Sequence, residues 1–135
     1  MRRAGMGVTA AAFLLAAASG CSDFERIDFQ YSADLPLDIR LTYEEIRLPT
    51  GVAVTTVARP MAGGSLMARN TKVELASADP TVLGVAFALP NEFGVSGESA
   101  GWTFVLYAVK AGSAEVTVRV DGEMKGEIPA TILPQ

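Results

Sequence analysis

The stretch 102-WTFVLYAVKAGSAEVTVRVDG-122 decides the fold. Its first part, 102–109, is almost continuously apolar, which is typical of a central strand covered on both faces. In 114–120 apolar residues alternate with polar ones, so this part predicts a strand with one face in a core and the other in water. Asp121-Gly122 follows at once, and this pair is a strong signal for a tight hairpin. The stretch therefore predicts antiparallel β structure.

Similar runs, separated by Pro, Gly, Asn and Asp, precede and follow this stretch. We expect further strands over 27–31, 37–42, 51–59, 71–76, 82–89 and 126–133. In 37–42 the alternation predicts that Leu37, Ile39 and Leu41 point inward. Pro60 should end the run before it, and Pro129 predicts an edge strand or a bulge, because proline has no N–H to donate. Seven or eight short strands without a convincing helix predict an antiparallel β-sandwich, with a small closed barrel as the alternative.

The N-terminus has the composition of a secretory leader. Arg2 and Arg3 supply the positive start, 8–18 is apolar, and Ser19-Gly20 are small. The apolar run is shorter than the about 20 residues that a spanning helix needs. We therefore predict a signal peptide over 1–20, exported by the general secretory route.

The segment that ends this leader, Leu14-Leu15-Ala16-Ala17-Ala18-Ser19-Gly20-Cys21, resembles the bacterial lipobox. The resemblance implies cleavage before Cys21 and acylation of that residue with fatty acids such as palmitate, which would anchor the protein to a membrane. It departs from the family at Ala18, where Leu, Val or Ile is usual. Ser22 in place of Asp implies, by analogy, the outer membrane. The alternatives are an ordinary signal peptide cleaved near Gly20, or an N-terminal helix that buries Cys21.

The rest of the chain is expected to form one domain on a short tether. We assign 21–35 to the tether, with 27–31 as an edge strand within it, and 36–135 to the domain. Cys21 is the only cysteine, so no disulfide can form within the chain. Removal of 1–20 takes away two arginines and no acid, which changes the net charge from −4 to −6. This acidic balance argues against nucleic acid as a partner and against electrostatic docking to anionic lipids.

Two elements of the domain resemble the bacterial immunoglobulin-like domains of group 2. The first is Ala76-Ser77-Ala78-Asp79-Pro80 with Val82 and Val85, and the second comprises Ala108, Gly112, Ala114, Val116 and Val118. The resemblance covers about residues 35–134 and implies an immunoglobulin-like sandwich without catalytic residues. Members serve as spacers, adhesin segments or surface modules. This chain departs from the family at Leu75, where Trp is frequent, and in its longer segment 89–101.

The composition leaves little room for catalysis. The chain has no histidine, and its one cysteine is the predicted anchor, which excludes Ser-His and Cys-His nucleophiles and the usual zinc sites. Glu44 and Glu45 are neighbours, and in a strand they would face opposite ways. Asp79 precedes Pro80 and Asp121 precedes Gly122, and aspartate is typical of turns at such positions. A calcium site is therefore not needed to account for either residue. We therefore predict no catalytic residue, no cofactor and no metal.

Binding residues are expected near the glycine-rich segment 91–101, which we predict to be a loop. Trp102 follows this loop and would either pack in the core or stack on a sugar or a partner. Phe93 within the loop would either pack against the domain and hold the loop in place, or be exposed to a ligand. The leading hypothesis is a non-enzymatic structural or interaction module that contacts an envelope protein or polysaccharide through this loop or a strand edge. The alternative is a small-molecule or glycan binder with Phe93, Trp102 and Tyr107 lining a cleft.

Overall fold

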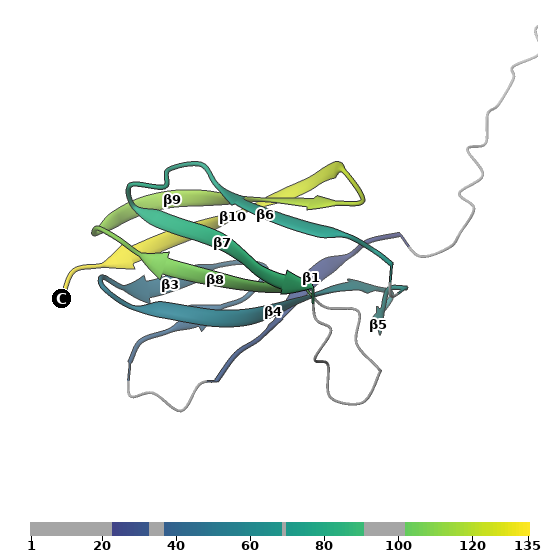
Figure 1. Cartoon of the computed structure of the whole chain (residues 1–135), viewed down its shortest axis with the longest axis horizontal. Coiled ribbons are helices and arrows are strands. Elements are labelled where there is room, and N and C mark those ends of the chain that lie inside the picture. The colour runs from purple at the N-terminus through teal and green to yellow at the C-terminus, as the bar shows by residue number, and fades with distance from the viewer. Residues whose placement is uncertain (1–22, 33–36, 69, 91–101) are drawn as a thin grey trace, which may run out of the picture.

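The computed structural model describes residues 23–32, 37–68, 70–90 and 102–135. Their strands are β1 (Arg26–Gln30), β2 (Arg40–Leu41), β3 (Ile46–Pro49), β4 (Ala53–Ala62), β5 (Ser65–Leu66), β6 (Val73–Ser77), β7 (Leu83–Pro90), β8 (Trp102–Ala108), β9 (Gly112–Val120) and β10 (Glu123–Leu133). They form two stacked sheets (Figure 1). The β4 sheet has the order β1-β4-β8-β7, with β5 also paired to β4, and the β10 sheet has the order β2-β3-β10-β9-β6.

The strand order is that of an immunoglobulin-like sandwich. In that fold one sheet contains strands A, B, E and D, and the other contains G, F and C. Here β1-β4-β8-β7 corresponds to the first order and β10-β9-β6 to the second. β3 pairs with β10 in parallel, and the other pairings are antiparallel. The predicted all-β sandwich is confirmed, and the two separate sheets replace the closed barrel that we kept as the alternative.

The core lies between the two sheets and follows the period-two pattern of the sequence. β8 contributes Phe104, Leu106 and Ala108, and β9 contributes Val116 and Val118, all of which are buried. β8 pairs with β4 on one side and with β7 on the other, so it is central as predicted. It is not covered on both faces, however. Tyr107, at 43% exposure, lies on the outer face of the sheet.

The predicted hairpin at Asp121-Gly122 joins β9 to β10. Asp121 has a φ of 51° and Gly122 a φ of 85°, the left-handed conformations that a two-residue hairpin requires. Asp121 also bonds to the neighbouring chain, because its N–H donates to the Lys72 carbonyl and its side chain accepts the Lys72 N–H, both at 2.9 Å. This turn therefore ties the hairpin to the start of β6.

Two prolines lie inside strands. β4 continues through Pro60, where we expected it to end, and Pro60 pairs with Ile27 of β1. β8 pairs with β4 only as far as Ala58, so the missing N–H of Pro60 lies beyond the end of that ladder, and the Pro60 carbonyl accepts the Met67 N–H at 2.9 Å. Pro129 lies in β10, which is central, yet the pairing of β10 with β3 begins only at Ala130. Both prolines thus lie just outside one of the two ladders that their strand forms, Pro60 beyond the β4–β8 pairing and Pro129 before the β10–β3 pairing.

The segment 37–42 differs from our prediction. Only Arg40–Leu41 is a strand, and Leu37 is 43% exposed, so it does not point into the core. A turn follows immediately, in which the Thr42 hydroxyl accepts the N–H groups of Glu44 and Glu45. This turn reverses the chain into β3, a strand that we did not predict.

The N-terminal boundary of the domain also moves. Residues 26–30, close to the edge strand that we expected inside the tether, form β1 and pair with β4. Ile27 is 1% exposed and belongs to the core. Phe24 packs edge-on against Tyr43, with ring centroids 5.9 Å apart. The sandwich therefore includes residues that we had assigned to 21–35.

The ring of Tyr107, on the outer face of its sheet, covers a glycine of β7. Gly84 is directly opposite Tyr107 in the antiparallel pair, and it is buried beneath the tyrosine ring. A Cβ on Gly84 would lie 1.9 Å from the ring. An aromatic residue that covers a glycine on the opposite strand removes the glycine backbone from water and stabilises the pair.

We expect Gly84→Ala to destabilise the domain by about 1–3 kcal/mol, because the ring must move to make room. In a Tyr107→Ala background the same substitution should cost much less, since alanine is otherwise preferred to glycine in a strand. Urea unfolding of the four proteins of this double-mutant cycle measures the difference. Equal costs of Gly84→Ala in both backgrounds would contradict the proposed contact.

Candidate functional site

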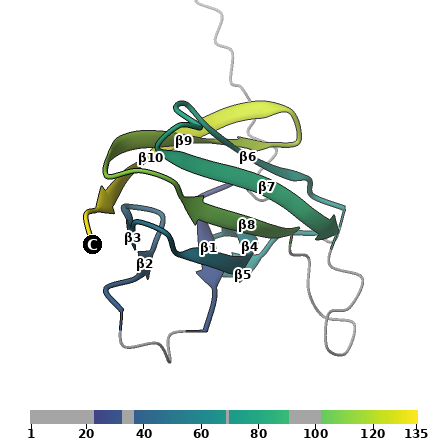
Figure 2. The same cartoon turned by 60° about the vertical axis from the view of Figure 1, so that its left-hand side comes forward.

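A groove opens between β6 and β7, the last strands of the two sheets on one side of the sandwich. The two strands lie next to each other in both views (Figures 1 and 2). The groove has a volume of about 330 Å³ and is lined by Lys72, Val73, Glu74, Leu75, Phe87, Trp102 and Phe104. Leu75 is the position where the resemblance implies Trp, and it lines this groove with a smaller side chain.

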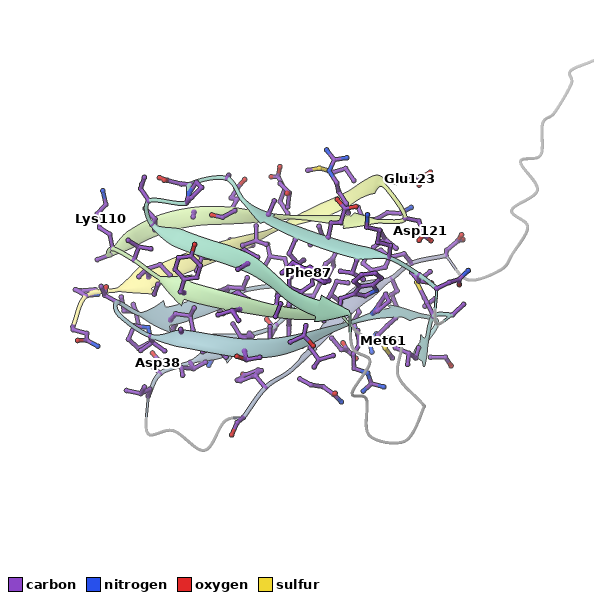
Figure 3. The ribbon with its side chains drawn as sticks, viewed as in Figure 1. Asp38, Met61, Phe87, Lys110, Asp121 and Glu123 are labelled. Atoms are coloured by element: carbon purple, nitrogen blue, oxygen red, sulfur yellow. The ribbon has the colours of Figure 1, made fainter. Side chains whose placement is uncertain are left out.

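Three aromatic rings form one wall of the groove. The centroid of Phe87 lies 5.7 Å from the centroid of Trp102 and 5.7 Å from that of Phe104. Trp102 and Phe104 alternate on the inner face of β8, and the register places Phe87 directly opposite Phe104. Phe104 is buried, Trp102 is partly buried, and Phe87 is 52% exposed. Phe87, which is labelled in Figure 3, is thus the most exposed ring of the cluster.

Trp102 is held in place by its polar atom. Its Nε1–H donates a hydrogen bond of 2.7 Å to the Thr71 carbonyl, on the chain just before β6. The ring therefore joins the end of one sheet to the edge of the other. The ring packs against the core, which is one of the two roles that we considered for Trp102, and it also lines the groove.

The rim of the groove carries one ion pair. Lys72 Nζ lies 3.1 Å from Glu74 Oε1, and both side chains are largely exposed. An exposed pair of this kind contributes little to stability. The groove is therefore mainly apolar, with one positive and one negative group that face solvent and remain accessible to a ligand.

The groove between β6 and β7 contains only part of the aromatic cleft that we considered as the alternative. Trp102 lines the groove, but Tyr107 lies on the opposite face of the β4 sheet above Gly84, so it does not take part. Phe93 and the segment 91–101 lie outside the described residues, as does Cys21. Phe87 was not among our candidates, although the alternation of Val85 and Phe87 in the run 82–89 would have placed it on the inner face of its strand.

A second groove lies on the other side of the sandwich, between β1 and β2. It has a volume of about 510 Å³ and is lined by Arg26, Ile27, Asp28, Phe29, Gln30, Leu41, Thr42, Tyr43, Glu44 and Arg59. Arg26 Nε lies 2.7 Å from Asp28 Oδ1, and this contact raises the pKa of Arg26. Arg26 and Asp28 are thus paired with each other, whereas the Nε of Arg59 is buried without a hydrogen-bond partner among the described residues.

The residues that we considered for calcium or acid-base chemistry serve local structure. Asp79 accepts hydrogen bonds from the N–H and hydroxyl of Thr81, which lower the pKa of its carboxyl. Glu44 and Glu45 lie at the turn after Thr42. Within the described part of the chain, no group of three or more His, Cys, Asp and Glu residues could hold a metal ion. Among the same residues we find no helix with the length and apolar character that crossing a membrane requires.

Two carboxyl groups meet on the outer face of the β10 sheet. A hydrogen bond from Glu127 to Glu115, together with the repulsion between the two charges, raises the pKa of Glu127. Glu115 lies on β9 and Glu127 on the adjacent β10. The raised pKa means that folding favours the protonated form, so this pair stabilises the domain at low pH and loses that contribution as the pH rises through the pKa of the folded state.

Glu127→Gln should therefore make the domain more stable than the wild type at neutral pH. Below the ordinary pKa of a glutamate the advantage should vanish, because the wild-type pair is then protonated. Urea unfolding at a series of pH values measures both limits, and Glu115→Gln should give the same result. An unchanged stability at neutral pH in both variants would show that the two carboxyl groups do not interact.

Comparison with known proteins supports the fold. No family model and no curated protein matches the sequence. Three solved structures of the S-layer protein SbsC are similar in architecture. Domains 4 and 5 match with a TM-score of 0.51 and 14% identity over 84% of this chain and 54% of that one. Domains 5–6 match with a TM-score of 0.53 and 14% identity over 84% and 45%. Domains 1–6 match with a TM-score of 0.51 and 14% identity over 85% and 14%.

This chain thus spans about half the length, or less, of the SbsC structures that it matches. At this level of identity the likeness shows the fold alone. The fold and its groove define an all-β, immunoglobulin-like sandwich with an apolar groove between two strand edges.

Proposed function

We propose that this chain is a lipid-anchored lipoprotein of the cell envelope that carries one immunoglobulin-like domain as a non-enzymatic structural and interaction module. The leader 1–20 is removed and Cys21 carries the acyl chains. The observation that carries the proposal is the lipobox-like segment ending at Cys21, directly ahead of a sandwich whose first strand begins at Arg26. Several acyl chains hold a protein on a membrane far longer than one chain does.

The fold supports a structural role at the cell surface. The similar structures are domains of the S-layer protein SbsC, so this fold occurs in a protein of a surface layer. The composition also favours a non-enzymatic role, because the groove between β6 and β7 combines apolar side chains with a single Lys72–Glu74 pair. The resemblance to bacterial immunoglobulin-like domains points the same way, since it brings no catalytic residue.

A protein partner would bind best as an extended segment along β7. β7 is the last strand of its sheet, so one side of its backbone has no strand partner within the described sandwich. An added strand would satisfy those N–H and C=O groups, and every second side chain of the segment would enter the groove beside Phe87. The register of β7 shifts between Phe87 and Leu89, and such bulges interrupt pairing. The usable edge is therefore the part before the bulge, 83–87.

A glycan or small molecule is the second candidate, and the Phe87–Trp102 cluster favours it. Sugar rings stack on aromatic faces, and Lys72 and Glu74 lie at the rim where hydroxyl groups would be. The volume of about 330 Å³ lies at the lower end of the range of roughly 300–1,000 Å³ for ligand pockets. The groove is thus large enough for a single sugar ring or for the end of a glycan chain. An extended peptide segment would bind the edge of β7 in addition to the groove.

Site-specific crosslinking separates these possibilities. Benzoylphenylalanine in place of Phe87 keeps an aromatic ring in the groove, and the same residue in place of Ala86 projects from the opposite face of β7 as a matched control. We expect adducts in intact cells with the probe at position 87 and none at position 86. A protease-sensitive adduct of discrete mass supports a protein partner, and a carbohydrate-positive adduct supports the second candidate. Equal labelling at both positions would contradict a binding role for the groove.

A further inference from the structure

The described chain begins next to the hairpin formed by β4 and β5. The Glu25 N–H donates a hydrogen bond of 2.7 Å to the Met61 carbonyl, and Arg26 pairs with Met61. Asp23 and Phe24 line a small hollow together with Met67 of the chain after β5 and with four residues around the β9–β10 turn, Val120, Asp121, Glu123 and Lys125. In Figure 3, Met61, Asp121 and Glu123 mark this end of the sandwich, and Lys110 marks the other.

Very little chain separates this end from the anchor position. Only Ser22 lies between Cys21 and Asp23. Two residues span at most about 7 Å when fully extended. The polar layer of a bilayer is itself roughly 5–8 Å thick on each side. A domain attached in this way cannot move away from the surface, and the end that carries the β4–β5 hairpin must lie against the membrane.

The hairpin has the composition that such a position requires. The sequence 60-PMAGGSLMA-68 contains no charged residue. Its exposed residues are Gly63 and Gly64 of the turn, Ser65 and Ala68, while Leu66 and Met67 are partly buried and Pro60 and Met61 are buried. The other hairpin at this end differs, because Asp121, Glu123 and Lys125 make it charged and exposed. Moving charged groups out of water costs far more than moving apolar ones.

We infer that the β4–β5 hairpin, residues 60–68, is a membrane-contact surface that rests in the interface of the bilayer beside the lipidated Cys21. The inference rests on the proposed anchoring. The net negative charge of the chain does not oppose it, because the contact depends on uncharged and apolar groups rather than on attraction to anionic lipids. The sandwich then stands with its C-terminus and the β8–β9 turn directed away from the membrane (Figure 1).

The position of fluorescent labels in the anchored protein tests this arrangement. Acylation consumes the thiol of Cys21, so Ser65→Cys, Glu123→Cys and Lys110→Cys each provide one free thiol for an environment-sensitive dye. The three sites report the β4–β5 hairpin, the charged hairpin at the same end, and the far end. The proteins are purified with their acyl chains, inserted into phosphatidylcholine vesicles and compared with the same labelled variants in a Cys21→Ala background.

We expect the label at position 65 to shift to shorter wavelength and to gain roughly twofold in intensity on anchoring, as for an apolar hairpin in the interface. Labels at 123 and 110 should not change. No change at 65 in protein that floats with vesicles would overturn the inference and leave the anchor intact. A response at 123 instead of 65 would also overturn it. Protein without acyl chains, or protein that does not float, would contradict the proposed anchoring itself.

Discussion

Leu106→Ala should lower the free energy of unfolding by about 3 kcal/mol, within the range of about 2–5 kcal/mol for such truncations. Leu106 is fully buried on the inner face of β8, where it pairs with Val54 of β4 and Val85 of β7. The rigid strands on both sides cannot close the space that the lost methyl groups leave. For a domain of about 100 residues this corresponds to a fall in Tm of roughly 10–25 °C.

Val105→Ala is the matched control for this experiment. Val105 is the neighbouring residue of the same strand, and it lies on the partly exposed outer face. Its truncation should cost less than about 1 kcal/mol, since little buried apolar area is lost. Urea unfolding followed by the fluorescence of Trp102 measures both variants. Similar losses for the two substitutions would mean that the inner face of β8 is not the centre of the core.

Cys21→Ala should transfer the protein from the membrane fraction to the soluble fraction. Without the thiol no acyl chain is attached, and each CH₂ group that no longer enters the bilayer removes about 0.8 kcal/mol of binding free energy. Because each acyl chain contains many CH₂ groups, the loss of all the acyl chains abolishes stable association with the membrane. The domain should still fold, because Cys21 precedes β1, the first strand of the sandwich, which begins at Arg26.

Ser22→Ala is the control for this second experiment, because it alters the adjacent residue and keeps the thiol. It should remain in the membrane fraction, as quantified by immunoblotting after alkaline extraction. If Cys21→Ala stays with the membrane as firmly as Ser22→Ala, the anchor is not at Cys21 and the proposed function fails.

The strands that could be predicted from the sequence are those whose pattern depends on neighbours in the chain. Alternation in 114–120 and the Asp121-Gly122 turn were sufficient for the β9–β10 hairpin, because local backbone geometry sets both. β3 escaped prediction, because it has only four residues and begins directly after a turn that Thr42 makes with its hydroxyl, which we did not foresee. Leu37 was misplaced because the alternation in 37–42 extends beyond Arg40–Leu41, the two residues that pair with β3.

The groove could be predicted only in part. Trp102 and Tyr107 are separated by an odd number of positions in one strand, so the period of two already places them on opposite faces. The exposure of Phe87 has a different origin. It depends on how the edges of β6 and β7 lie across the gap between the sheets, and these strands belong to different sheets. No local pattern in 82–89 contains that information.

The mass of the intact protein from the membrane fraction tests the central claim most directly. A lipid-anchored module should give a chain that begins at Cys21 and carries the added mass of a diacylglyceryl group and fatty acids, and digestion should place that mass on the peptide that contains Cys21. A chain that retains residues 1–20, or one that begins near Cys21 without added mass, would contradict the account.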